Sequence, residues 1–286
     1  VGSMNLTDRG EVKRLLEKYG LAPKKSRGQN FLANANVVYD IADLCGDEDR
    51  CVIEIGPGVG AMTAELCKMY KKVLAIEVDK DLIPLLSEAL CEYDNLEIIE
   101  ADAMKIDFAA LVKEKFPDEK VSVCANLPYY ITSPVIMRLL DASEVFESIV
   151  VMIQKEVADR LCSAPGTADF GAITLAVDYK AEAKKCFSVS AGNFIPPPKV
   201  TSTVIKMKMR ENPPVAPVSV DNMFALIRAA FAQRRKTFAN AVRAASSKYS
   251  KEDIESALLS LGLPADVRGE KLGLSEYAAL SDILPL

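Results

Sequence analysis

The sequence predicts an α/β fold: a mostly parallel, Rossmann-like sheet of seven strands with a small all-helical domain after it. Three observations predict this. Short β-branched segments alternate with helical patterns between residues 50 and 155, the strands are apolar almost throughout, and a proline-rich segment precedes a region of helical periodicity. Such alternation is typical of a parallel sheet covered on both faces. We therefore expect a large domain at residues 1–210 and a smaller one at 211–286.

The individual elements follow in chain order. Five apolar segments are predicted as the parallel strands: 51–55, 72–78, 96–101, 121–126 and 148–154. Helical patterns lie between them, at 60–70, 80–91, 106–116 and 133–141. Residues 171–189 and 200–209 are predicted as antiparallel strands that complete the sheet. After a linker at 210–220, periodicity predicts helices at 221–247, 251–261 and 275–284.

Composition excludes several classes of chemistry. The 286 residues include no histidine, which excludes Ser-His-Asp and Cys-His catalysis and argues against a zinc site, so no metal is expected. The seven cysteines form no CxxC pair and lie mostly in apolar stretches, which predicts reduced, buried thiols in a cytoplasmic protein. No apolar run reaches the roughly 18 residues of a membrane span, and no signal peptide is recognisable.

The net charge of −5 is unevenly distributed. Residues 184–248 contain twelve Lys/Arg against only Glu211 and Asp221, and the first thirty residues contain seven Lys/Arg against three acidic residues. A chain divided in this way is suited to binding a polyanion on one side. Charge alone leaves open the alternative of ordinary solvated lysine faces.

A glycine-rich turn follows the first predicted strand. The segment "VIEIGPGVGAMTAEL" (52–66) reads as strand, turn and helix, and Gly56, Gly58 and Gly60 would let the backbone approach a ligand closely. The spacing is GxGxG and not the GxGxxG of dinucleotide-binding proteins. An ordinary tight strand–helix turn is the alternative.

Acidic residues end the next two strands. Glu77 is suited to the hydroxyls of a ribose, and Asp102 to an adenine amino group. Alone, such a carboxylate is more often a helix cap. Because ligands of open α/β sheets bind at the carboxyl ends of the strands, three such features on consecutive strands predict a nucleotide site. They do not separate NAD from S-adenosylmethionine.

The fourth strand ends in "CANLPYY" (124–130). Pro128 stiffens the turn, while the Asn126 side chain and the Leu127 backbone offer carbonyl oxygens to an exocyclic amine. Tyr129 offers a ring on which a base can stack. The arrangement favours a flipped-out or single-stranded base with an NH₂ group. A polar strand end beside a core tyrosine is the alternative.

These motifs carry a resemblance. With "EIGPGVG", "IEVD" and "ADAM", the "NLPY" motif resembles the class I S-adenosylmethionine-dependent N6-adenine methyltransferases. Five further segments resemble the small-subunit ribosomal RNA adenine dimethyltransferase family: "SRGQNFL" (26–32), "QKEVADRL" (154–161), "FIPPPKVTSTV" (194–204), "AFAQRRKTFANAV" (230–242) and "RGEKLGLSEYAAL" (268–280). The likeness covers nearly the whole chain after Met4. The related erythromycin-resistance methyltransferases share the core motifs, and the asparagine of "QNFL", the triple proline and the "RGEKL" tail favour the small-subunit family.

The resemblance implies the activity and its site. It implies S-adenosyl-L-methionine as cofactor and N6,N6-dimethylation of two adjacent adenosines in a hairpin near the 3′ end of 16S ribosomal RNA, within the small subunit or its precursor, by a monomer. The cofactor-binding residues would be Asn30, Leu32, Gly56, Gly58, Glu77, Asp102 and Asn126. The catalytic residues would be Asn126, Leu127, Pro128, Tyr129 and Phe194, with Tyr129 and Phe194 on the two faces of the adenine. Tyr130 is a departure, because many members have asparagine there.

The basic regions supply the candidate RNA contacts. Arg234, Arg235 and Lys236 are predicted to begin a helix, with Arg228 and Arg243 nearby. Lys24, Lys25 and Arg27 of the N-terminal arm would extend the same track. Phosphate contacts of this kind position an RNA without specifying its sequence. A solvated basic helix end is the alternative.

Two other functions fit parts of the sequence. A nucleotide-dependent oxidoreductase would use the glycine turn and Glu77, but it gives no reason for "NLPY" or for the basic region. A non-enzymatic assembly factor of the small ribosomal subunit fits the basic region, and the complete motif set argues against a purely structural role.

Overall fold

A computed structural model describes residues 3–286; residues 1 and 2 of the predicted first domain lie outside the described residues. The chain divides into two compact units. The first consists of the chain up to Ala158 together with Ala183–Met209, and the second of Asp159–Glu182 together with Arg210–Leu286. The second unit thus takes in a segment that the sequence suggested for the first domain. The roles assigned to the two domains stay predictions.

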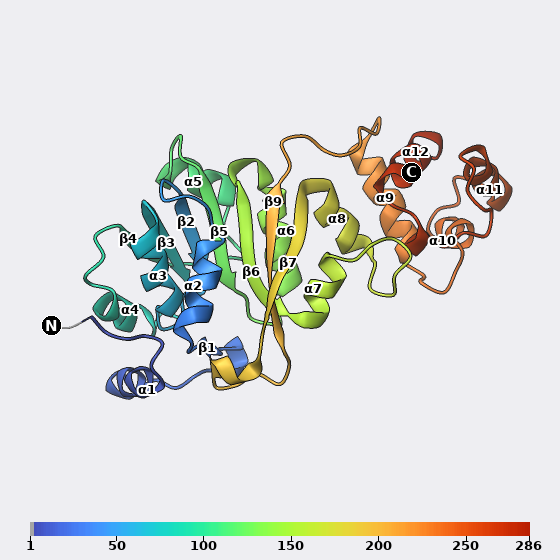
Figure 1. Cartoon of the computed structure of the whole chain (residues 1–286). Helices are drawn as coiled ribbons and strands as arrows, with labels where there is room; N and C mark the ends of the chain where they lie inside the picture. The colour runs from blue at the N-terminus through green and yellow to red at the C-terminus, as the bar shows by residue number, and fades with distance from the viewer. Residues whose placement is uncertain (1–2) are drawn as a thin grey trace. The chain divides into compact units, whose positions relative to one another are not determined.

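The first unit is built on a seven-stranded sheet in the order β4-β3-β2-β5-β6-β9-β7 (Figure 1). The five predicted parallel strands are confirmed as β2 (Cys51–Ile55), β3 (Lys72–Glu77), β4 (Leu96–Glu100), β5 (Val121–Asn126) and β6 (Ser148–Gln154). Strand β9 (Ser202–Met209) runs antiparallel to β6, and β7 (Ala181–Val189) lies at the edge. The predicted α/β fold with a mostly parallel sheet is therefore confirmed.

Helices lie on both sides of this sheet (Figure 1). The helices of this part of the chain are α1 (Arg9–Lys18), α2 (Ala35–Asp43), α3 (Ala61–Met69), α4 (Ile83–Ala89), α5 (Phe108–Lys115), α6 (Thr132–Asp141) and α7 (Lys155–Leu161), whose residues are divided between the two units. Short 3₁₀ turns are η1 (Lys25–Arg27), η2 (Ser143–Val145) and η3 (Ala191–Asn193). The sequence patterns found α3 to α6 but not α1, α2 or α7. Side-chain caps start both α1 and α2: Asp8 accepts the Glu11 N–H, and Asn34 accepts the Asn36 and Val37 N–H groups.

A second, two-stranded sheet joins distant parts of the chain. Strand β1 (Phe31–Leu32) pairs antiparallel with β8 (Phe194–Ile195). Phe31, Leu32 and Phe194 are buried and belong to one hydrophobic cluster with the helices of the first unit. The "QNFL" segment is thereby fixed beside the segment that precedes the triple proline.

Strand register places the functional segments at one edge of the large sheet. Ile55 pairs with Ile76 on one side and with Ala125 on the other, so β2, β3 and β5 end at nearly the same level. Gly56, Glu77 and Asn126 follow or occupy these ends. This is the edge where open α/β sheets bind ligands.

The second unit is all helical apart from its two-residue share of β7. It contains α8 (Ala172–Lys180), α9 (Val220–Phe231), α10 (Phe238–Ala245), α11 (Lys251–Ser260), η4 (Gly269–Lys271) and α12 (Leu274–Ile283). The prediction of a strand across 171–180 is wrong. Leu175 and Tyr179, one helical turn apart, are buried in the hydrophobic cluster of α9 to α12, and this tertiary burial outweighs the β-branched character of the segment.

The prediction of reduced, buried cysteine thiols has a mixed outcome. The seven cysteines all lie in the described part of the chain and form no disulfide. Cys45, Cys51, Cys67 and Cys124 are buried as expected, but Cys91, just beyond the end of α4, is exposed.

Within residues 3–286, no helix has the length and apolar character to cross a membrane, and no cluster of three or more His, Cys, Asp or Glu residues is placed to hold a metal ion.

Candidate active site

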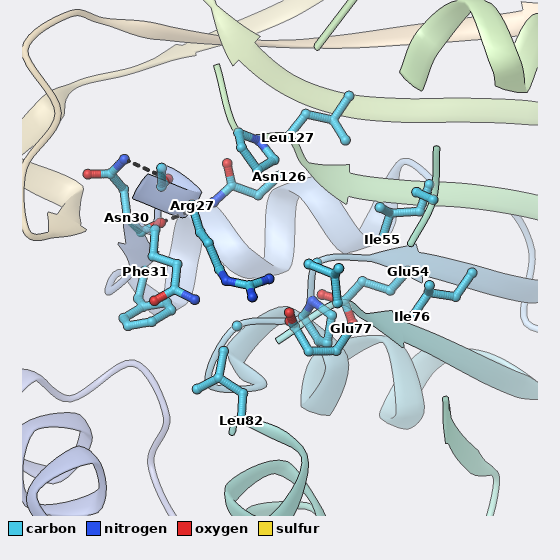
Figure 2. Close-up of a pocket in the computed structure, with 18 of the residues that line it drawn as sticks. Arg27, Asn30, Phe31, Glu54, Ile55, Ile76, Glu77, Leu82, Asn126 and Leu127 are labelled. Carbon is cyan, nitrogen blue, oxygen red and sulfur yellow. Dashed lines mark hydrogen bonds between the residues drawn. The ribbon is translucent and has the colours of Figure 1, made fainter. Parts of the chain in front are cut away.

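A pocket opens at the carboxyl edge of the sheet. Its walls come from the η1–β1 segment and the ends of β2, β3 and β5 (Figure 2). The start of the segment after β4 and Phe194 complete them. The pocket is open to solvent, and about 1120 Å³ of space lies within it when the solvent at its mouth is included. All of the predicted cofactor-binding and catalytic residues line it: Asn30, Leu32, Gly56, Gly58, Glu77, Asp102, Asn126, Leu127, Pro128, Tyr129 and Phe194.

The glycine turn needs glycine for two reasons. Gly56 and Gly58 have φ values of +72° and +60°, in the left-handed region that side chains disfavour. A Cβ on Gly58 would also lie 2.9 Å from the ring of Phe31. Gly60 is buried, and a Cβ there would lie 3.0 Å from Leu90, so this third glycine serves helix packing.

Glu77 is a buried carboxylate at the end of β3. Its Oε1 accepts the backbone N–H of Asp79 at 2.8 Å. Burial raises the pKa of Glu77, and hydrogen bonds from the backbone of Asp79 and Gly58 act against that rise. The side chain is thus held against the glycine turn, where its acceptor oxygens suit the hydroxyls of a ribose.

Asp102 lies across the pocket at the end of β4. Its Oδ1 accepts the Met104 N–H at 2.9 Å, and its backbone carbonyl accepts the Lys105 N–H at 2.8 Å. The following helix, α5, is capped by the side chain of Asp107. The helix-cap alternative therefore does not describe Asp102.

Asn126 is oriented by its own amide group. Its Nδ2 donates to the backbone carbonyl of Asn30 at 3.2 Å, while the Asn30 Nδ2 donates to the Gly28 carbonyl at 3.1 Å (both dashed in Figure 2). Because the amide nitrogen of Asn126 is used in this way, its Oδ1 is the atom left to accept a hydrogen bond in the pocket. Asn30 contributes to this arrangement through its backbone.

The rest of the "NLPY" turn is also fixed. Leu127 is buried and donates its N–H to the Met152 carbonyl at 3.2 Å. The Pro128 carbonyl accepts the Ile131 N–H at 3.2 Å and the Thr132 hydroxyl at 3.0 Å, where α6 begins.

The two aromatic residues expected at the base-binding end differ in setting. Tyr129 is half-buried and its hydroxyl is 3.2 Å from the Ser202 Oγ on β9. Phe194 is only 2% exposed, and it pairs with Leu32 in the two-stranded sheet. Both reach the pocket, and their stacking roles stay predictions.

Glu54 is a pocket residue that the sequence analysis did not single out. It lies on β2, is 3% exposed, and accepts a hydrogen bond from the Thr63 hydroxyl at 2.5 Å. Burial raises the pKa of Glu54 to about 8. The available signal was an acidic residue inside the otherwise apolar "VIEIG" strand, since a charge in a buried strand is costly unless it has a function or a partner.

The N-terminal arm is anchored by ion pairs. Lys24 Nζ lies 2.8 Å from Asp79 Oδ1 and 2.7 Å from Asp81 Oδ2, and Gln29 donates to Asp79 Oδ2 at 3.1 Å. Asp79 is buried; burial raises the pKa of Asp79, but hydrogen bonds from Lys24 and Gln29 outweigh it and hold that pKa below its usual value. Of the arm residues predicted to bind RNA, Lys24 is thus occupied within the protein. Arg27 lines the pocket with its Nε 3.9 Å from Asp79, and Lys25 is exposed.

The remaining predicted RNA contacts lie in the second unit. Arg228 on α9 and Arg243 on α10 are exposed. Arg234, Arg235 and Lys236 are exposed as well, but they occupy the turn between α9 and α10 and do not begin a helix as predicted. Thr237 caps α10 instead, accepting the Asn240 N–H, which delays the helix to Phe238. The Arg234 guanidinium donates to the Ala168 carbonyl at 2.9 Å.

Comparison with known proteins agrees with the expected family. A family model described as ribosomal RNA adenine dimethylase matches residues 20–271. The ribosomal RNA small subunit methyltransferase A of Geobacillus thermodenitrificans is 45% identical over 279 residues, which are 96% of this chain and 95% of that protein.

Solved structures agree with the fold. A dimethyladenosine transferase from Plasmodium falciparum has a TM-score of 0.73 and 26% identity, covering 87% of this chain and 95% of its own. The 23S rRNA methyltransferase ErmE, at 24% identity, has a TM-score of 0.69, covers 90% of this chain and 100% of its own, and supports the class I methyltransferase fold alone. The chain belongs to the ribosomal RNA adenine dimethylase family.

Proposed function

We propose that this protein transfers methyl groups from S-adenosyl-L-methionine to the N6 atoms of two adjacent adenosines in the 3′-terminal hairpin of 16S ribosomal RNA. Family membership makes the chain an rRNA adenine dimethyltransferase with S-adenosyl-L-methionine as methyl donor. The proposal adds the position in the RNA, a substrate within the small subunit or its precursor, a monomeric enzyme and a cytoplasmic location. Disulfide-free cysteines accord with that location.

The orientation of Asn126 carries the proposal. Its Nδ2 is bonded to the Asn30 carbonyl, so its Oδ1 is available to an amine donor at the pocket. Adenine N6 is a weak nucleophile because its lone pair is delocalised into the ring. Accepting an N6–H bond at Asn126 Oδ1, with a second at the Leu127 carbonyl, favours the pyramidal amine whose lone pair can attack.

The pocket residues fit the cofactor. Gly56 leaves open space beside the backbone, since a Cβ there would have only the Asn126 carbonyl oxygen within 4 Å, and the buried Glu77 carboxylate presents acceptors for a ribose. Asp102 would accept the adenine amino group. When bound, S-adenosyl-L-methionine supplies an electrophilic methyl group on its sulfonium.

The remaining work is positioning. Tyr129, held by Ser202, would present its ring to the target adenine, and Phe194 would close the opposite face. Holding the amine in line at attack distance can supply several kcal/mol of the barrier. The methylated amine is acidic and releases its proton to water, so the reaction requires no histidine base.

The test uses small ribosomal subunits that lack the modification. They are incubated with the protein and isotopically labelled S-adenosyl-L-methionine, and the RNA is digested to nucleosides. We expect labelled N6,N6-dimethyladenosine at two adjacent positions. Subunits in which no dimethyladenosine forms, or in which it maps outside the 3′-terminal hairpin, would contradict the proposal.

A further inference from the structure

Tyr130 is an aromatic residue at the mouth of the pocket. It lines the pocket but is 61% exposed, in contrast to its neighbour Tyr129, which is half-buried and bonded to Ser202. An exposed ring removes little apolar surface from water, so packing gives little reason for it.

The backbone that carries the ring is held by hydrogen bonds. Tyr130 lies inside the turn closed by the Ile131 N–H and the Thr132 hydroxyl, both bonded to the Pro128 carbonyl. Across from it lies Gly28, where a Cβ would be 3.7 Å from Tyr130 Cδ1. Because the backbone on both sides is held, a ligand that stacks on this ring orders little additional chain.

Two cationic residues lie on the turn that ends at Gly28. Gly28 ends the η1 turn by donating its N–H to the Lys25 carbonyl, so Lys25 and Arg27 stand on the turn that faces Tyr130. Lys25 is exposed and, within residues 3–286, makes no ion pair; the Arg27 side chain is 38% exposed. A flat ring beside cations is the combination that binds single-stranded nucleic acid, through base stacking and phosphate contacts.

We propose that Tyr130 is a second base-stacking site, for the nucleotide adjacent to the target adenosine. This inference rests on the proposed function. An adenine bound beside Tyr129 is covalently joined to its neighbours, whose bases must therefore lie at the rim of the pocket, where Tyr130 is. The turn thus presents two consecutive tyrosines to two consecutive nucleotides, one inside the pocket and one at its mouth.

The test compares wild type with Tyr130→Phe and Tyr130→Ala. Steady-state methylation of subunits lacking the modification gives kcat and KM for RNA. In parallel, a short RNA carrying 2-aminopurine next to the target adenosine reports stacking through fluorescence quenching. Tyr39→Ala is the matched control, because Tyr39 is 50% exposed on α2 and does not line the pocket.

We expect Tyr130→Phe and Tyr39→Ala to behave as wild type. Tyr130→Ala should lose the quenching and raise KM for RNA by about 5- to 100-fold, the range for one base–aromatic stack, with kcat changed less than twofold. Should Tyr130→Ala fail to fold in thermal melting, Tyr130→Asn replaces it, with the same expectation.

Unchanged KM and unchanged quenching in a folded variant would overturn the inference. A fall in kcat without a change in KM would overturn it too, by placing Tyr130 at the reacting base. A wild-type protein that produces no dimethyladenosine would instead contradict the proposed function, and the fluorescence measurement on wild type would still report whether the ring stacks a base.

Discussion

At the scale of single residues, substitution of Asn126 should affect methyl transfer and not RNA binding. Replacing it by alanine removes both the Oδ1 acceptor and the bond to the Asn30 carbonyl. We expect turnover to fall by about 100-fold or more, the usual cost of one preorganised polar group at a reacting centre, with RNA affinity unchanged. Single-turnover methylation and filter binding measure the two quantities, and Asn240→Ala on the exposed face of α10 is the control. A parallel loss of turnover and RNA binding would contradict the assigned role.

Glu54 predicts a pH dependence of stability. Its pKa is about 8 in the folded protein against 4.5 for the ordinary group, so between these values the folded state holds a proton that the unfolded chain releases. The free energy of unfolding should therefore fall as pH rises through this window, by up to about 1.4 kcal/mol per unit, and level off above it.

Thermal and denaturant unfolding of Glu54→Gln from pH 5 to 9 would check this. The variant keeps an oxygen for the Thr63 hydroxyl but has no titrating group. Its free energy of unfolding should therefore rise relative to that of wild type as the pH increases to about 8. Glu252→Gln, at an exposed position on α11, should follow wild type at every pH. Equal pH slopes in wild type and Glu54→Gln would show that the carboxyl is not held protonated.

Residue patterns predicted much of the pocket for a physical reason. Glu77, Asp102 and Asn126 are polar residues at the ends of apolar strands, and parallel strands bring their ends to one edge. Glu54 could not be predicted as a pocket residue in the same way, because its raised pKa results from burial in the folded protein. Lys24 was predicted to bind RNA because it lies in a basic segment. Its acidic partners Asp79 and Asp81 are more than fifty residues away in the sequence, so counting charges along the chain does not reveal the ion pairs.

At the scale of elements, the Lys24–Asp79 pair holds the arm that frames the pocket. Lys24→Ala would leave the buried Asp79 carboxylate with fewer partners and loosen the segment whose Asn30 carbonyl orients Asn126. We expect affinity for S-adenosylhomocysteine to weaken about tenfold, as for a lost charged hydrogen bond. Isothermal titration calorimetry measures this affinity.

Lys25→Ala is the matched control for that experiment, because Lys25 is an adjacent, exposed lysine. It should leave the affinity for S-adenosylhomocysteine unchanged. If Lys24→Ala instead weakened only RNA binding, Lys24 would be the phosphate contact that the sequence suggested, and the arm would not depend on it.

Elements were predictable where local pattern and burial agree. Four of the five parallel strands, β2, β3, β5 and β6, are buried almost throughout and read as apolar runs, so their bounds were nearly correct. Strand β4 lies at the edge of the sheet and is only partly buried. Helix α8 was misassigned because "AITLAVDYK" has β-branched residues, and its helical form depends on contacts with a core assembled from residues 40 or more positions later. Strands β1 and β8 have two residues each, too few for any periodicity to show.

At the scale of the whole molecule, the positive charge is concentrated in a few regions. The turn between α9 and α10 exposes Arg234, Arg235 and Lys236, and each phosphate contact made there would release counterions. We expect Arg234→Ala/Arg235→Ala to weaken RNA binding and to reduce the slope of log affinity against log salt by about 1 per lost contact, with cofactor affinity unchanged.

Binding titrations between about 50 and 200 mM salt check this prediction. Because Arg234 also donates to the Ala168 carbonyl, Arg235→Ala alone is the variant that leaves that bond in place. A lower slope in both variants supports a phosphate contact. If the slope of log affinity against log salt is unchanged in both variants, the turn between α9 and α10 makes no phosphate contact and is ordinary solvated surface.

The pairing of β1 with β8 fixes the order in which the active site can be completed during synthesis. Phe31 meets Ile195, a partner made more than 160 residues later, and closing so long a loop before other contacts exist is entropically unfavourable. The strands that carry Gly56, Glu77 and Asn126 can pair earlier, because each lies beside a near neighbour in sequence. A growing chain should therefore hold the five parallel strands with an open pocket until residue 195 emerges, and only then acquire the wall formed by the β1 segment.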